Sequence, residues 1–178
     1  MCIRDSLSYP IGPWVEPSEV SPAAIGAAIS RIAALPAAFR AAVEPLTDAQ
    51  LDTPYRPGGW SVRQLAHHLP DSHLNAYVRI KLALSEDAPT IRPYDQEAWA
   101  ELPDSVETPV RISLDLLTAL HARWVVLLRA MSPEQWSRQY HHPETGTQRL
   151  DTVILHYAWH GDHHLAHVTR LLDRMGWW

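Results

Sequence analysis

Long segments with an apolar residue every three or four positions alternate along the chain with shorter polar segments rich in proline. This spacing is that of one face of an α-helix. It predicts long helices over residues 22–43, 61–86, 110–131 and 150–175. The third of these helices has the clearest stripe, formed by Leu114, Leu117, Leu120, Trp124, Leu127 and Leu128. No segment shows sustained alternation of apolar and polar residues, so no β-sheet is predicted.

Local signals define where several helices begin and end. Ser21 followed by Pro22 is a favourable start for the first helix, and Ser61 with Gln64 forms a capping-box pattern for the second. Gly176 suits the end of the last helix. Pro36 is expected to kink or split the first helix. Short helical turns are expected after residue 47, over 95–102 and over 133–136.

Four long amphipathic helices indicate an all-α protein, a four-helix bundle. Two connections are long enough to cross over, so a simple up-down-up-down order is not implied. Residues 1–20 contain three prolines and no periodic pattern, which predicts an extended N-terminal arm. The bundle domain is then expected over residues 21–178, a length that suits one domain.

Charge and apolar content exclude several classes of protein. The net charge is −5 and the basic residues are scattered, which argues against nucleic-acid binding and against anchoring to an anionic membrane. The apolar runs are far shorter than the roughly 20 residues that span a bilayer, and no secretory signal is visible. Cys2 is the one cysteine, so no internal disulfide can form and a cytoplasmic location is expected. Nothing near Cys2 would lower its pKa, so it is a poor candidate nucleophile.

Eleven histidines are present, and several cluster at helical spacing. Residues four apart lie on one helix face, and two imidazoles at that spacing can bind one ion. A third ligand would come from the second helix, because facing helices build metal sites in bundles. Spacing alone leaves the ligands open among His156, His160, His163, His164 and His167 on the last helix and His67, His68 and His73 on the second. The isolated His121, His141 and His142 are expected to be surface or hydrogen-bonded core residues.

Separate motifs in a fixed order identify a family likeness. They are LDTPYRPGGWSVRQLAHHLPDSH over residues 51–73, IRPYD over 91–95, YAWHGDHHLAH over 157–167 and RMGW over 174–177. With them the chain resembles the DinB/YfiT-like superfamily, and within it the YfiT-type metal-dependent hydrolases, from about Leu7 to Trp177. The resemblance implies a four-helix bundle of the DinB/YfiT type, a cytoplasmic location and a homodimer.

The resemblance also selects the metal ligands that spacing left open. They are His68, eight residues after Trp60, and the C-terminal pair His160 and His164. Zinc is the expected ion, with nickel as the alternative. The chain departs from the family pattern in two places. Residues 1–6 match nothing in the family and are a possible cloning or sequencing remnant. Pro70 replaces a small residue, so the helix near His68 is expected to bend. His67, His163 and His167 are then expected to line the pocket, where they would orient the ligands or touch the substrate.

Three neutral imidazoles leave coordination positions open, as in catalytic zinc sites. Such an ion can activate water for hydrolysis of a small molecule, or hold a low-molecular-weight thiol such as bacillithiol for S-transfer. A non-enzymatic metal-binding stress protein is the alternative of another class. Asp71 is a candidate for a hydrogen bond to an imidazole or for a general base. A solvated residue on the helix surface is an equally good interpretation. Four residues are candidate contacts for an anionic substrate, although each can instead have a surface or structural role: Arg56, Arg63, Arg92 and Tyr94.

Overall fold

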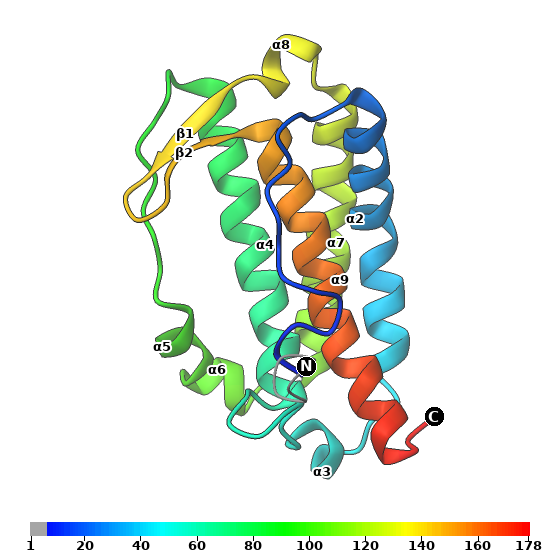
Figure 1. Cartoon of the computed structure of the whole chain (residues 1–178). Coiled ribbons are helices and arrows are strands. Elements are labelled where there is room, and N and C mark those ends of the chain that lie inside the picture. Colours follow the sequence, from blue (N-terminus) through cyan, green and yellow to red (C-terminus); the bar gives the residue numbers. More distant parts are fainter. Residues whose placement is uncertain (1–6) are drawn as a thin grey trace.

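The computed structural model describes residues 7–178, so the expectation for residues 1–6 lies outside the described residues. The four predicted long helices are present as α2 (Pro22–Val43), α4 (Val62–Ser85), α7 (Val110–Ala130) and α9 (Leu150–Met175). Residues 9–20 form no helix or strand and run along the bundle beside α9 (Figure 1). The shorter elements are α3 (Asp48–Leu51), α5 (Gln96–Ala100), α6 (Pro103–Val106), α8 (Pro133–Trp136), β1 (Gln139–His142) and β2 (Gly146–Arg149).

The predicted helix ends are confirmed. Ser21 accepts a hydrogen bond from the backbone N–H of Ala24, with Pro22 in the first turn of α2. Ser61 and Gln64 form a reciprocal capping box at the start of α4. Gly176 ends α9 in the left-handed conformation, at φ 65°. These caps satisfy backbone groups that a helix end would otherwise leave without partners.

The helices form a bundle in which α2 and α4 each pack against both α7 and α9. Figure 1 shows that α2 and α9 run in one direction and that α4 and α7 run in the other. The parallel pair α4 and α7 requires a long connection, and residues 86–109 descend the outside of the bundle through α5 and α6. The order is therefore not up-down-up-down.

The core has two apolar clusters, one at each end of the bundle. The cluster at the β-hairpin end is centred on Trp124 and Ile154, and the other on Phe39 and Leu69. Between them, α4 and α9 carry the segments 67–73 and 160–167, whose buried residues are mostly histidines. A polar layer therefore crosses the middle of the bundle.

The prediction that the chain contains no sheet was wrong. Strands β1 and β2 form a two-stranded antiparallel hairpin, and His142 pairs with Gly146 beside the turn. Each strand has four residues and only Tyr140 among them is buried, so the apolar pattern is too short to signal a strand. The hairpin also holds the crossover segment, because the N–H of Ile91 donates to the carbonyl of His141.

Of the kink or split expected at Pro36, the split does not occur, and Pro70 does not interrupt its helix either. Helices α2 and α4 continue through these residues. An internal proline removes one backbone hydrogen bond, but it does not remove the packing of the helix face. Both prolines are buried within the bundle, so packing on the neighbouring helices keeps each helix continuous.

Helix α2 is long and apolar enough to cross a membrane, with a mean hydropathy of 1.4 over its best window. A single helix of this kind is weak support for a membrane span, because core helices meet the same criterion. One face of α2, which includes Ile29, Ile32 and Phe39, is buried, and the helix packs against α7 and α9.

Candidate metal centre

Imidazoles from α4 and α9 meet in the polar layer. On α9, His160 and His164 lie one turn apart, and their Nε2 atoms are 3.0 Å from each other. The ring of His68 on α4 lies opposite them, with centroid distances of 5.5 Å to His160 and 5.0 Å to His164. One nitrogen from each of the three residues falls within 4.8 Å of the other two.

Burial keeps these imidazoles neutral near pH 7. It lowers the pKa of His68 to about 4. The pKa values of His160 and His164 lie well below the ordinary value, chiefly because of burial and secondarily because of the neighbouring histidines. A neutral imidazole has a free lone pair, which is the form that binds a metal.

A chain of hydrogen bonds fixes which nitrogen of His160 is free. The carbonyl of Ile32 can only accept, so Nδ1 of His121, 2.7 Å away, carries the proton. His121 Nε2 then accepts from His73 Nδ1 at 2.8 Å, and His73 Nε2 accepts from His160 Nδ1 at 3.2 Å. This histidine relay leaves the lone pair of His160 on Nε2, directed at His164. Hydrogen bonds of this kind commonly orient metal-binding histidines.

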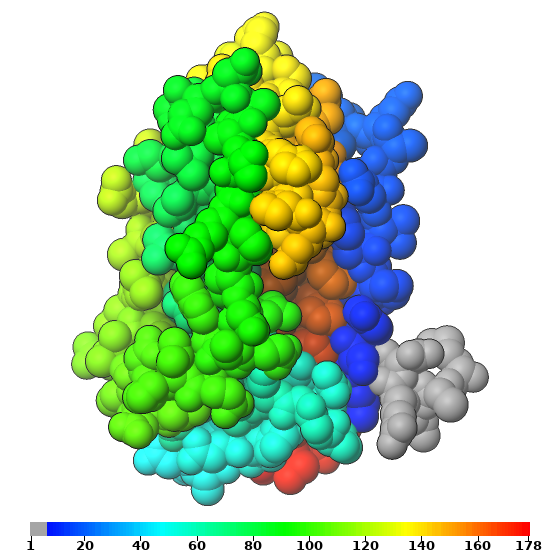
Figure 2. All heavy atoms as spheres, turned by 90° about the vertical axis from the view of Figure 1, so that its left-hand side faces the viewer, coloured from blue at the N-terminus to red at the C-terminus, as the bar shows by residue number. Residues whose placement is uncertain are grey.

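The three histidines open onto a pocket of about 820 Å³ that includes Tyr9, Tyr55, Arg56 and Glu101 in its walls. The Trp60 ring packs on His68 at a centroid distance of 4.6 Å, and its Nε1 donates to Glu97 at 3.0 Å. Figure 2 shows this face hollowed between the N-terminal segment, the hairpin and residues 86–100, with α9 at the floor. A small molecule can therefore reach the cluster from solvent.

The donor set fits a divalent metal. In a tetrahedral zinc site with Zn–N bonds of about 2.0–2.1 Å, ligand nitrogens lie about 3.3 Å apart. The 3.0 Å separation of the His160 and His164 Nε2 atoms is close to that value. His68, His160 and His164 would hold the ion, and the pocket leaves room for a further small ligand.

Comparison with known proteins shows the family to which the chain belongs. The model of the DinB superfamily matches residues 31–168. This chain belongs to the DinB superfamily. It is 48% identical to YfiT of Bacillus subtilis over 97% of both chains, and 50% identical to a Bacillus pumilus protein over 97% of this chain and 98% of that one. Each of these relatives is named "Putative metal-dependent hydrolase".

Solved structures support the fold. The structure of Bacillus subtilis YfiT, described as having an unusual four-helix bundle topology, covers 97% of this chain and 99% of its own with a TM-score of 0.94. A second four-helix bundle protein, TT2238, is 20% identical and has a TM-score of 0.54, which supports the fold alone. The predicted DinB-type bundle is thus confirmed.

A second group of histidines in this DinB-superfamily chain lies wholly on α9. One nitrogen from each of His163, His164 and His167 falls within 4.8 Å of the others. Burial lowers the pKa of His167 to about 3, and the nearby His163, Arg56, Arg170 and Arg174 add to this shift. Positive charge so close to the group disfavours a cation there. The group that spans α4 and α9 is therefore the better metal site.

The remaining predicted site residues separate into those in the pocket and those outside it. His163 and His167 line the pocket beside the cluster. His67 turns away, because its ring nitrogens lie 2.7 Å from Ser113 Oγ and 3.0 Å from the Thr108 carbonyl. Asp71 has no hydrogen bond to an imidazole in the described part of the chain, although burial, together with Asp104, raises its pKa to about 6.

The candidate anion contacts also separate. Arg63 is bound at 2.6 Å by Asp52 and at 2.9 Å by Asp48, so it fastens α3 to α4. The side chain of Arg92 is exposed, and its carbonyl accepts a hydrogen bond from Arg79. Arg56 lines the large pocket, whereas Tyr94 lines a second pocket on the other side of His160.

Sequence reasoning gave no role to several residues that shape the site. The orienting partner of Trp60 is Glu97, which comes from the crossover connection far along the chain. Tyr55 packs on His167 at a centroid distance of 4.1 Å, although the family motif contains it. The relay joins four helices, from the Ile32 carbonyl on α2 to His160 on α9, so helical spacing within one of them could not reveal it.

Proposed function

We propose that this protein is a metal-dependent hydrolase of a small molecule. His68, His160 and His164 would hold one divalent ion, with zinc preferred over nickel for a set of three imidazoles. The observation that carries the proposal is that these neutral histidines converge at the floor of a pocket of about 820 Å³. A bound ion of this kind lowers the pKa of water and polarises a carbonyl.

The protein's own residues would bind and orient the reactants. The relay through His73 and His121 would present the lone pair on Nε2 of His160 to a bound ion. Trp60, held by Glu97, covers one face of His68 and limits the access of water to it. Metal-dependent hydrolysis is also the activity that the names of the relatives suggest.

The ligand assignment is tested by elemental analysis of purified protein and of the variants His68→Ala, His160→Ala and His164→Ala. We expect about one ion per chain in the unmodified protein and at least roughly tenfold less in each variant, since each removes a direct ligand. His141→Ala is the matched control, because His141 is an exposed histidine on β1. Full metal content in any one ligand variant would remove that residue from the assignment.

Thiol S-transfer is a second candidate reaction for the same site. Two pockets meet at His160 and Gln96, which both of them share, so two reactants could approach the metal together. This arrangement favours S-transfer, in which a low-molecular-weight thiol attacks an electrophile. Metal-loaded protein is incubated with an activated ester in water, and with an electrophile and a panel of thiols. Turnover in water alone supports hydrolysis, and thiol conjugates detected by mass spectrometry support transfer.

A metal-binding stress protein without activity would instead have a closed coordination shell. Azide binding to cobalt-substituted protein, seen as a change in the visible spectrum, would count against that alternative.

We also propose a homodimer in the cytoplasm that binds neither nucleic acid nor membrane. Exposed Leu74, Val78 and Val126 offer apolar surface for the dimer, and analytical ultracentrifugation would measure its mass.

A further inference from the structure

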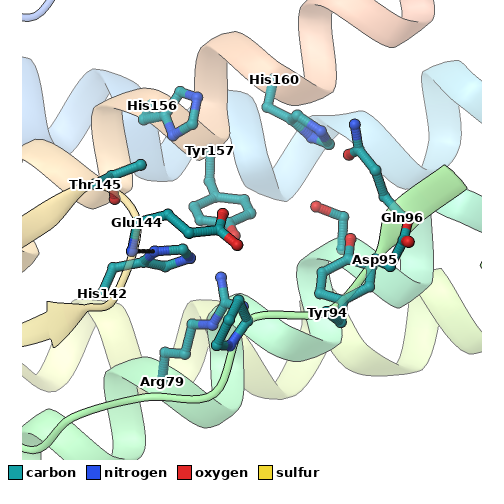
Figure 3. A pocket seen from close by; sticks show the side chains of 12 residues that line it. Arg79, Tyr94, Asp95, Gln96, His142, Glu144, Thr145, His156, Tyr157 and His160 are labelled. Carbon is teal, nitrogen blue, oxygen red and sulfur yellow. Dashed lines mark hydrogen bonds between the residues drawn. The ribbon is translucent and has the colours of Figure 1, made fainter.

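The second pocket, of about 610 Å³, lies on the hairpin side of His160. Figure 3 shows its lining, with Arg79 reaching in from α4, Tyr157 and His156 from α9 and Glu144 from the hairpin. Arg79 lies eleven residues after His68 on α4, about 16 Å along the helix axis. The pocket therefore leads from the proposed metal centre to a guanidinium group.

Arg79 is a buried cation without an acidic partner. Arg79 is 8% exposed, and within residues 7–178 no ion pair includes it. One terminal nitrogen donates to the carbonyl of Arg92 at 3.2 Å, and the buried Nε has no hydrogen-bond partner. A buried charge is costly unless an opposite charge neutralises it. An anion in the pocket would supply that charge.

The other charged groups of the pocket limit the kind of anion. Glu144 is exposed on the hairpin, and exposed Asp95 accepts a hydrogen bond from the N–H of Ala98 as the cap of α5. Two carboxylates at the mouth disfavour a doubly charged phosphate, while a single carboxylate can pass to the guanidinium. Neutral hydroxyls of Ser72, Tyr94 and Tyr157 line the same pocket.

We propose that Arg79 binds a carboxylate of the substrate, and that the substrate is an elongated carboxylic acid whose reacting group lies at the metal. The position of the reacting group rests on the proposed function, whereas the carboxylate site itself does not. Arg79 would then select among substrates through a charge-assisted hydrogen bond.

The test compares ω-mercaptoalkanoic acids with ω-mercaptoalkanols of equal length, from three to eleven carbons, by calorimetric titration of zinc-loaded protein. The thiol anchors each probe at the ion, and only the acid can reach Arg79 with a charge. We expect the longer acids to bind at least about tenfold more tightly than the matching alcohols. Arg79→Gln should abolish this difference, and Glu144→Gln should keep or increase it.

A metal-free arm separates the two proposals. Octanoate, 1-octanol and octyl phosphate are titrated into chelator-treated protein by ligand-observed NMR, with Arg79→Gln as control. Octanoate binding that depends on Arg79 supports the carboxylate site even if the thiols fail to bind, a failure that would refute the open metal centre alone. Equal binding of octanoate and octanol, an acid preference that persists in Arg79→Gln, or tighter binding of octyl phosphate would overturn the proposal.

Discussion

At the residue scale, the most informative feature is the order of protons in the histidine relay. Only the Ile32 carbonyl at its end lacks a choice of role, and that one constraint determines the tautomers of His121, His73 and His160 in turn. His73 and His121 are 0% and 1% exposed, so water does not compete for these hydrogen bonds. The relay therefore couples a core carbonyl on α2 to a proposed metal ligand on α9.

We predict that His121→Phe weakens metal binding by about 10- to 100-fold, the usual effect of losing an orienting partner of a ligand. The substitution removes the acceptor for His73 Nδ1, so His73 no longer holds His160 in one tautomer. Competition with a chromophoric chelator measures the affinity.

His67→Phe is the matched control for this experiment. His67 is buried on α4 as well, but its partners are Ser113 and Thr108, outside the relay. Both variants should lose on the order of 1–3 kcal/mol of stability, because each leaves buried polar groups without partners. Unchanged metal affinity in a folded His121→Phe protein would contradict the role of the relay.

Some residue roles could be predicted from the sequence, and others could not. The convergence of His160 and His164 follows from their spacing on one helix, and the family motif selected His68 among its neighbours. Spacing could not show that Arg63 is held by Asp48 and Asp52, because those partners lie in another element. Arg79 carries no local signal at all, since its importance depends on the lack of an ion-pair partner for it within residues 7–178.

At the element scale, the long helices were predictable because each has a continuous apolar face and recognisable caps. The hairpin was missed because four-residue strands give no measurable period, and their pairing depends on contacts with residues 89–91. The length of residues 86–109 allows the crossover that makes α4 and α7 parallel, but it does not require it. Its actual path depends on the contacts of α5 and α6 with α4.

The close approach of α2 and α9 is set by Gly161, the residue after His160. A Cβ at this position would collide with Cδ2 of Leu35, which is buried in the core. We predict that Gly161→Ala lowers the free energy of unfolding by about 1 kcal/mol, because overpacking costs about 1–3 kcal/mol and helix propensity returns at most about 1 kcal/mol. Urea denaturation monitored by circular dichroism measures the change.

Two comparisons isolate the collision. In a Leu35→Ala background the added methyl group meets open space, so Gly161→Ala should become stabilising there. Gly26→Ala, on an exposed part of α2 with no atom within 4 Å of the added carbon, should stabilise by up to about 1 kcal/mol. If Gly161→Ala is equally harmful with and without Leu35, contact between these helices is not the cause.

At the scale of the whole molecule, a metal bound by His68, His160 and His164 would join α4 to α9 across the middle of the bundle. At a free ion concentration of 100 times Kd, binding stabilises the folded state by about 2.7 kcal/mol. For a chain of this size we predict that removal of the ion by a chelator lowers Tm by roughly 5–10 °C. Differential scanning calorimetry should show no such metal-dependent shift in His68→Ala.

The polar layer should also make the metal-free protein sensitive to acid. Burial lowers the pKa of His68, His121 and His163 to about 4, whereas these side chains titrate near 6.5 in the unfolded chain. Between pH 6.5 and 4 the unfolded state therefore binds more protons, so stability is fully present above pH 6.5 and is lost as the pH falls. Asp71 acts in the opposite direction, because its pKa is raised to about 6 and the folded state takes up its proton first. One carboxyl against several imidazoles leaves a net loss of stability in acid.

We therefore predict that the free energy of unfolding of chelator-treated protein falls continuously from pH 7 to pH 4.5. The loss reaches on the order of 3 kcal/mol for a fully buried imidazole such as His121, whose pKa is lowered from 6.5 to about 4. Urea titrations at several pH values measure the slope, and His121→Phe should make it shallower because one titrating imidazole is gone. A flat profile would mean that these histidines reach water in the folded protein, and the pocket floor would then be too wet to keep them neutral for a metal in mild acid.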